Sequence, residues 1–181
     1  MRLEKEDNHI DVYSDTEKGD VGYSIIFDDS NRRITVFYEF SSDIYLPESK
    51  IIELMMQKRN VNDFNELLKF LSELKKVSKD PSVTSIYNWL MLNRSKLKNA
   101  PVKSSDMFAM WVEYKGKDET FKFEISFGPA IKIIRLYLIM IRSFVFPESI
   151  YTELRKSAKE IKNVNDFLNF IDTLAQSKSV S

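Results

Sequence analysis

The stretch Asn60-Val61-Asn62-Asp63-Phe64 decides the architecture, because it recurs letter for letter at Asn163-Val164-Asn165-Asp166-Phe167. A second shared word, Pro-Glu-Ser, stands upstream of each copy, at residues 47–49 and 147–149. Two shared words in the same order indicate an internal duplication of the chain.

The apolar pattern upstream of these words aligns without a gap at an offset of 100 residues. For example, Tyr23 and Phe27 align with Phe123 and Phe127, and the run 34–40 aligns with 134–140. At the pentapeptide the offset becomes 103, which predicts a three-residue insertion near 158–160. The repeated unit then covers roughly residues 8–77 and 107–177.

Each copy begins with three strand-like segments, and in all but the last of them apolar and polar residues alternate, as in a strand with one buried face. They lie at 9–13, 23–27 and 33–46, and again at 107–114, 121–127 and 131–146. The short, turn-rich connections favour antiparallel hairpins. Run 131–146 is apolar on both faces. Taken alone it would suit a buried helix after Pro129, but its gapless match to the first copy favours a strand, which must then be covered on both sides. We therefore expect a central strand there, at an interface between repeats or subunits.

Two helices follow the strands in each copy. The first begins at the Pro-Glu-Ser word, because proline suits the first helical position and the glutamate complements the positive helix end. The pentapeptide indicates a corner between helices: Asn60 or Asn163 ends one helix in the left-handed conformation, and Asn62 or Asn165 caps the next. The second helix has an apolar stripe, expected to pack on the sheet of its own repeat.

These features predict an α+β fold built as an internal duplication of a βββαα unit, with antiparallel sheets covered by helices. Residues 1–79 form the first repeat and residues 106–181 the second. Residues 80–105 between them contain an extra helix that starts at Pro81 and bridges the copies, followed by a linker around Pro101.

The composition argues against catalytic, metal-binding and membrane-spanning functions. Lys plus Arg and Asp plus Glu are both 27, so no net charge attracts nucleic acid or an anionic membrane. There is no cysteine, and the only histidine, His9, aligns with Ala109, so a Cys/His zinc site and a histidine triad in each repeat are excluded. We expect no enzymatic activity, no cofactor and no metal. The sequence also lacks the pattern of a signal peptide or a membrane span, so we expect a cytoplasmic protein.

Binding is the class of function that remains, and we expect a scaffold or accessory subunit that docks other protein chains. It would act as a homodimer or within a larger assembly, such as an archaeal or viral nucleoprotein particle of the CRISPR effector kind. The candidate interface residues are large apolar and aromatic side chains of the extra helix and of the two-faced run. They are Trp89, Met91, Leu92, Tyr137, Ile139 and Ile141.

The alternative is a protein that binds single-stranded nucleic acid. Strand aromatics such as Trp111 would stack on bases, and a basic region around the linker would contact phosphates. The basic candidates are Arg94, Lys96, Lys98, Lys103, Lys115 and Lys117. The balanced overall charge argues against this alternative.

Overall fold

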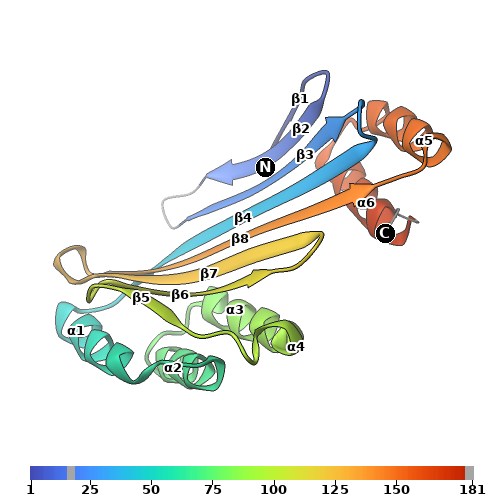
Figure 1. Ribbon diagram of the computed structural model, residues 1–181. Coiled ribbons are helices and arrows are strands. Elements are labelled where there is room, and N and C mark those ends of the chain that lie inside the picture. Colours follow the sequence, from blue (N-terminus) through green and yellow to red (C-terminus); the bar gives the residue numbers. More distant parts are fainter. Residues whose placement is uncertain (16–18, 178–181) are drawn as a thin grey trace.

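The computed structural model describes residues 1–15 and 19–177, and Figure 1 shows its arrangement of strands and helices. The strands are β1 (Arg2–Lys5), β2 (His9–Asp15), β3 (Asp20–Asp28), β4 (Arg33–Tyr45), β5 (Lys103–Ser105), β6 (Ala109–Lys115), β7 (Glu119–Gly128) and β8 (Ile133–Val145). The helices are α1 (Glu48–Gln57), α2 (Phe64–Val77), α3 (Pro81–Leu92), α4 (Arg94–Leu97), α5 (Glu148–Lys159) and α6 (Val164–Gln176). Short 3-10 turns cover Lys58–Asn60 and Pro129–Ile131.

All eight strands belong to one antiparallel sheet in the order β1-β2-β3-β4-β8-β7-β6-β5. Each half of the chain contributes four consecutive strands, and the last strand of each half pairs with the other in the middle (Figure 1). The predicted α+β class and antiparallel pairing are confirmed, and run 131–146 is a central strand. The predicted number of strands is wrong, because a short strand, β1 or β5, precedes the expected three in each half.

The strand registers of the two halves repeat at an offset of 100 residues. Val21 lies opposite Phe40 in the β3–β4 ladder, and Phe121 lies opposite Met140 in the β7–β8 ladder. In the central β4–β8 ladder, Glu39 lies opposite Ile139, the residue 100 positions later. An approximate two-fold axis perpendicular to the sheet therefore passes through this central pair.

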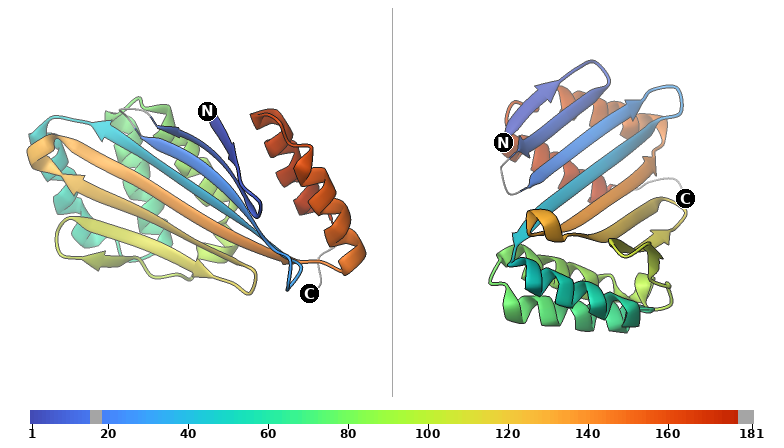
Figure 2. Two further views of the ribbon diagram at one scale, coloured as in Figure 1. Left: turned by 90° about the horizontal axis from the view of Figure 1, so that it is seen from above. Right: turned by 90° about the vertical axis from the view of Figure 1, so that its left-hand side faces the viewer.

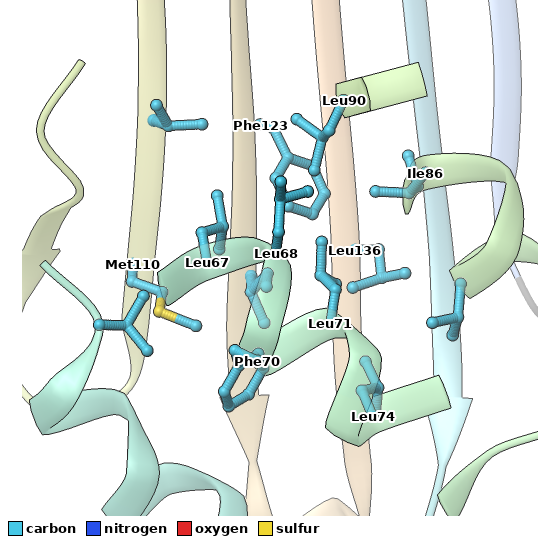
Figure 3. Close-up of a cluster of buried hydrophobic side chains, with 14 of the residues drawn as sticks. Leu67, Leu68, Phe70, Leu71, Leu74, Ile86, Leu90, Met110, Phe123 and Leu136 are labelled. Carbon is cyan, nitrogen blue, oxygen red and sulfur yellow. The ribbon is translucent and has the colours of Figure 1, made fainter. Parts of the chain in front are cut away.

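The helices of each half pack on the strands of the other half. Helices α1, α2 and α3 share a core with β6, β7 and β8, whereas α5 and α6 share a core with β2, β3 and β4. Figure 3 shows the first of these cores, with Phe70 and Leu71 of α2 lying among Met110, Phe123 and Leu136 of the second-half strands. The prediction that each helix pair covers its own repeat is wrong.

Each central strand extends beyond its neighbour from the same half, and this explains why the helices of each half cover the strands of the other. The β3–β4 ladder ends at Phe40, so residues 41–45 of β4 pair only with β8. The chain therefore leaves β4 beside the second half, and α1 begins there. In the same way, residues 143–145 of β8 lie beyond the β7–β8 ladder but still pair with β4, and α5 begins beside the first half.

The extra helix predicted between the copies is divided at Asn93 into α3 and α4. Val83, Ile86 and Leu90 of α3 are buried in the core that contains the second-half strands. The Ser42 hydroxyl of β4 donates a hydrogen bond to Ser82 Oγ at 2.9 Å, so α3 contacts both halves. The predicted linker contains the short strand β5. No helix in the described part of the chain is long and apolar enough to cross a membrane.

The two helix corners lie 100 residues apart, not 103. Asp63 caps α2 by accepting a hydrogen bond from the Glu66 N–H, and Asn163 caps α6 by accepting one from the Asp166 N–H. The identical pentapeptides therefore occupy different positions in their corners, and the predicted three-residue insertion is wrong. The predicted caps Asn62 and Asn165 are wrong as well.

The backbone at the corners also differs from the expected left-handed stop. Asn163 has a φ of −149°, which is extended backbone, and Asn60 lies in a 3-10 turn. Pro47 and Pro147 stand one position before the first helical residue, as the N-cap residues of α1 and α5.

The observed cap gives a stability prediction. Asn163→Ala removes the acceptor for the Asp166 N–H and should lower the free energy of unfolding by about 1 kcal/mol. Asn165→Ala, at an exposed position inside α6, should leave it unchanged or raise it slightly because alanine favours helix. Urea denaturation of both variants measures the difference, and an equal loss in the two would contradict the assigned cap.

A polar contact joins the β3–β4 turn to α5 of the other half. Arg155 Nε donates to Asp29 Oδ1 at 2.9 Å, and the Tyr151 hydroxyl donates to the same oxygen at 2.5 Å. The hydrogen bond from Arg155, followed by that from Tyr151, lowers the pKa of the Asp29 carboxyl. This ion pair therefore links the β3–β4 turn to α5, the helix that covers the first-half strands.

The lowered pKa predicts a pH-dependent contribution from Asp29. Because the folded-state pKa lies below the unfolded value of about 3.9, the contribution is present above that pH and is lost as pH falls through the folded-state pKa. The gap in melting temperature between wild type and Asp29→Asn should therefore be largest at neutral pH and close below about pH 4. Thermal denaturation from pH 2.5 to 7 checks this, and in an Arg155→Met background the gap at neutral pH should shrink.

Candidate interaction surfaces

Both helical layers lie on the same face of the sheet and leave the other face open. The apolar even-numbered residues of β4 and β8, such as Ile34 and Leu136, belong to or pack against the two cores. No odd-numbered residue of these strands belongs to either core. Figure 2 shows the sheet with its helices from two further directions. We call the surface formed by the odd-numbered residues of β4 and β8 and their neighbours across the sheet the open face.

The centre of the open face is apolar. Phe37 lies directly opposite Ile141, and Ile139 lies two residues away on the same strand. Ile26 on β3 is 44% exposed, and Phe37, Ile139 and Ile141 are each half-buried in the single chain. We call these four residues the central patch.

Tyr137, beside the central patch, is hydrogen-bonded to a carboxylate. The Tyr137 hydroxyl donates to Glu39 Oε1 at 3.0 Å. Burial, followed by this hydrogen bond, raises the pKa of Tyr137 to about 12, so its hydroxyl keeps its proton at neutral pH.

The same pairing recurs toward both edges of the open face. The Trp111 indole donates to Glu113 Oε1 at 2.8 Å, and the Tyr13 hydroxyl donates to Glu4 Oε1 at 2.7 Å. The hydrogen bond from Trp111 lowers the pKa of the Glu113 carboxyl, which therefore stays charged. Three aromatic side chains of the open face thus have a carboxylate as a hydrogen-bond partner.

The two halves of the open face differ in charge. Among the side chains that the structure describes, the register places six acids and two bases of the first half on it: Glu4, Asp11, Asp20, Asp28, Glu39, Asp43, Arg2 and Arg33. It places four bases and two acids of the second half there: Lys103, Lys115, Lys122, Arg135, Glu113 and Glu124. Arg135 is paired with the buried Asp43 at 2.7 Å, across the boundary between the halves. The open face is therefore acidic on one side of the central strands and basic on the other.

The helical face also has an uncovered region, because the two helical layers sit over opposite ends of the central strands. Between α3 and α6 runs a groove of about 430 Å³, floored by β3, β4 and β8. Trp89 of α3 lines it and packs edge-on against Phe121 with ring centroids 5.0 Å apart.

The structure does not bring the six predicted interface residues together. Tyr137, Ile139 and Ile141 lie on the open face, and Trp89 lies in the groove on the opposite face. Met91 and Leu92, 39% and 84% exposed, lie at the C-terminal end of α3. The two-residue period of the strand predicted at 131–146 could have separated these sets, because it assigns Tyr137, Ile139 and Ile141 to one face.

The residues predicted for nucleic acid are also divided. Trp111, Lys103 and Lys115 lie on the open face. Lys96 pairs with Glu119 at 2.6 Å, and its Nζ lies 5.9 Å from the centre of the Phe121 ring, on the helical face of the sheet. The other three lie on α4 (Arg94), just after it (Lys98) and in the β6–β7 turn (Lys117). They form no continuous basic strip.

Acidic side chains and the single histidine do not gather into a metal-ligand cluster in the described part of the chain. Within residues 1–15 and 19–177, no group of three or more histidine, aspartate or glutamate side chains could hold a metal ion. His9 is a partly exposed strand residue, with its Nε2 3.4 Å from an Asp11 carboxylate oxygen and 3.7 Å from one of Glu6.

Comparisons with protein-family models, with curated proteins and with solved structures found no match for this chain. Its two uncovered surfaces, the open face and the groove, are therefore interpreted from their own geometry.

Proposed function

We propose that the chain is a duplicated unit whose function is protein–protein association, and that its open face docks on a second copy of the same chain. The duplication is supported by matched details besides the strand registers. Arg32 and Lys132, 100 residues apart, both have left-handed backbone, with φ of 53° and 60°. Each accepts a hydrogen bond across the centre, Arg32 from the Phe146 N–H and Lys132 from the Leu46 N–H.

The observation that carries the dimer is the charge division of the open face around an apolar centre. A two-fold axis parallel to β4 and β8, between two facing sheets, places the acidic half of one copy over the basic half of its partner. The central patches of the two copies then contact each other, as in an isologous dimer, in which both subunits use the same surface. Sheets pack face to face about 10 Å apart, a gap that side chains of this size fill.

The open face is also large enough. Eight strands spaced about 4.8 Å apart, with about 3.3 Å per residue along each strand, give a face of roughly 800–1,000 Å². A stable protein interface buries about 800 Å² per partner. One face-to-face contact would therefore suffice without a contribution from the helices.

The same surface fits nucleic acid poorly. Binding to single strands requires aromatic rings together with cations that track the phosphates. Here three aromatic side chains of the open face, Tyr13, Trp111 and Tyr137, are each hydrogen-bonded to a glutamate. A phosphate backbone that followed these rings across the whole open face would also cross its acidic half, which contains Glu4 and Glu39.

Sedimentation velocity on the purified chain over a wide concentration range tests the proposal. We expect a concentration-dependent species of twice the chain mass that weakens as salt is raised, because opposite charges meet across the interface. A fluorescein-labelled oligothymidylate of 30 nucleotides should not bind at physiological salt. A chain that stays monomeric at every concentration would refute the dimer, and salt-sensitive oligothymidylate binding that is lost in Trp111→Ala would favour the alternative.

A further inference from the structure

The groove between α3 and α6 has an apolar lining. Its floor and walls include Val36, Phe40, Leu138, Met140 and Ile171. Its volume of about 430 Å³ lies in the range of about 300–1,000 Å³ typical of small-molecule sites. The cavity is thus large enough for a hydrocarbon chain or a small ring system.

The polar groups that line the groove are all able to donate hydrogen bonds, and no carboxylate is among them. They are Tyr23, Tyr38, Ser85, Trp89 and Arg142. The structure shows no protein acceptor, within the residues it describes, for the Tyr23 and Tyr38 hydroxyls, whose rings lie 4.7 Å apart. No polar side-chain atom there is both buried and unsatisfied, so these hydroxyls face the groove solvent.

The tyrosine hydroxyls are proton donors at neutral pH. Burial raises the pKa of Tyr38 to about 12, and burial also raises the pKa of Tyr23. Neither hydroxyl therefore becomes an anion that would repel a negatively charged ligand.

Arg142 supplies the positive charge of the groove. Its guanidinium lies 5.3 Å from the centre of the Phe144 ring, and in the described part of the chain no acidic group pairs with it. The nearest acid by register is Glu119, directly across from Arg142 on β7. The Glu119 carboxylate is already engaged by Lys96 at 2.6 Å, so the Arg142 charge is left for a ligand.

We propose that this groove binds an amphipathic anion, a carboxylate attached to a hydrocarbon chain or ring system. The apolar part lies along Phe40, Leu138 and Met140, and the carboxylate contacts Arg142 and the tyrosine hydroxyls. A guanidinium and a carboxylate form a strong charge-assisted pair, which selects an acid over an alcohol or a cation of the same length.

Tryptophan fluorescence can follow binding at this site, because Trp89 lines the groove and the only other tryptophan, Trp111, lies on the open face. In a Trp111→Phe background, laurate below its micelle concentration should shift the Trp89 emission in a saturable way. Dodecanol should bind more weakly, and dodecyltrimethylammonium weaker still. Equal affinity for laurate and dodecyltrimethylammonium would overturn the proposal.

Variants locate the two parts of the ligand. Arg142→Gln should weaken laurate binding about tenfold and leave dodecanol binding unchanged. Ser85→Trp, at an exposed position on the rim, should fill the groove and abolish both. Arg33→Gln, an exposed arginine on the open face, is the matched control and should bind as wild type does. Unchanged laurate binding in Arg142→Gln or in Ser85→Trp would place the ligand elsewhere and refute the site.

Discussion

Phe170→Ala is expected to lower the free energy of unfolding by about 3–5 kcal/mol, the usual cost of removing a buried phenylalanine ring. Phe170 on α6 is 5% exposed, and its ring lies 6.2 Å from that of Phe27 on β3. Because α6 covers the first-half strands, amide hydrogen exchange should accelerate most in β2 and β3, although these strands are more than 140 residues away in the chain. Denaturant unfolding measures the loss of stability, and exchange followed by mass spectrometry locates it.

The chain itself offers a matched control for this experiment. Phe70 occupies the equivalent position on α2, is 3% exposed and packs on Phe127 of β7 at 5.9 Å. Phe70→Ala should cost a similar free energy but accelerate exchange in β6 and β7 instead. Faster exchange in the strands of the variant's own half, for either substitution, would contradict the exchanged packing of helices.

Much of the fold was readable from local patterns. The gapless match to run 33–46 identified run 131–146 as a strand, although it is apolar on both sides and resembles a buried helix in composition. Proline followed by glutamate marked the starts of α1 and α5 to within one residue. These features depend on neighbouring residues in the chain, so a sequence contains them directly.

The exchange of helices was not readable in this way. An apolar stripe shows that a helix such as α2 must be covered, but not by which strands. The choice depends on the overhang of β4 beyond Phe40, a long-range property of the ladders. The pentapeptide was misleading because both of its copies contain good capping residues, and the cap is Asp63 in one corner and Asn163 in the other.

The candidate surfaces were only partly predictable for a related reason. The sequence identified Trp89 and Ile139 as apolar residues without an assigned partner, but only the three-dimensional arrangement places them on opposite faces. Arg142 was not singled out as a binding residue, because its importance depends on Glu119 being engaged by Lys96. No local spacing contains that information.

Ile139→Lys is expected to weaken the proposed dimer about 100-fold or more, which corresponds to a loss of about 2.7 kcal/mol or more in binding free energy. Ile139 lies at the centre of the open face, directly opposite Glu39, where the approximate two-fold axis crosses the sheet. In the dimer the lysine ammonium would be removed from water between two apolar patches, a desolvation cost that pairing with the adjacent Glu39 offsets only in part. In the monomer it can remain in solvent, because that face is open. Sedimentation velocity measures the shift, and circular dichroism checks that the chain still folds.

The control for this substitution is Leu92→Lys. Leu92 was an equally strong candidate in the sequence and is 84% exposed at the end of α3, away from the open face. The dimer dissociation constant should therefore remain that of the wild type, since this lysine replaces a side chain outside the contact. If Leu92→Lys dissociates the dimer and Ile139→Lys does not, the chains associate through their helices and the open face is not the interface. If both variants weaken the dimer equally, the loss follows from the added positive charge and not from the position of Ile139 in the interface.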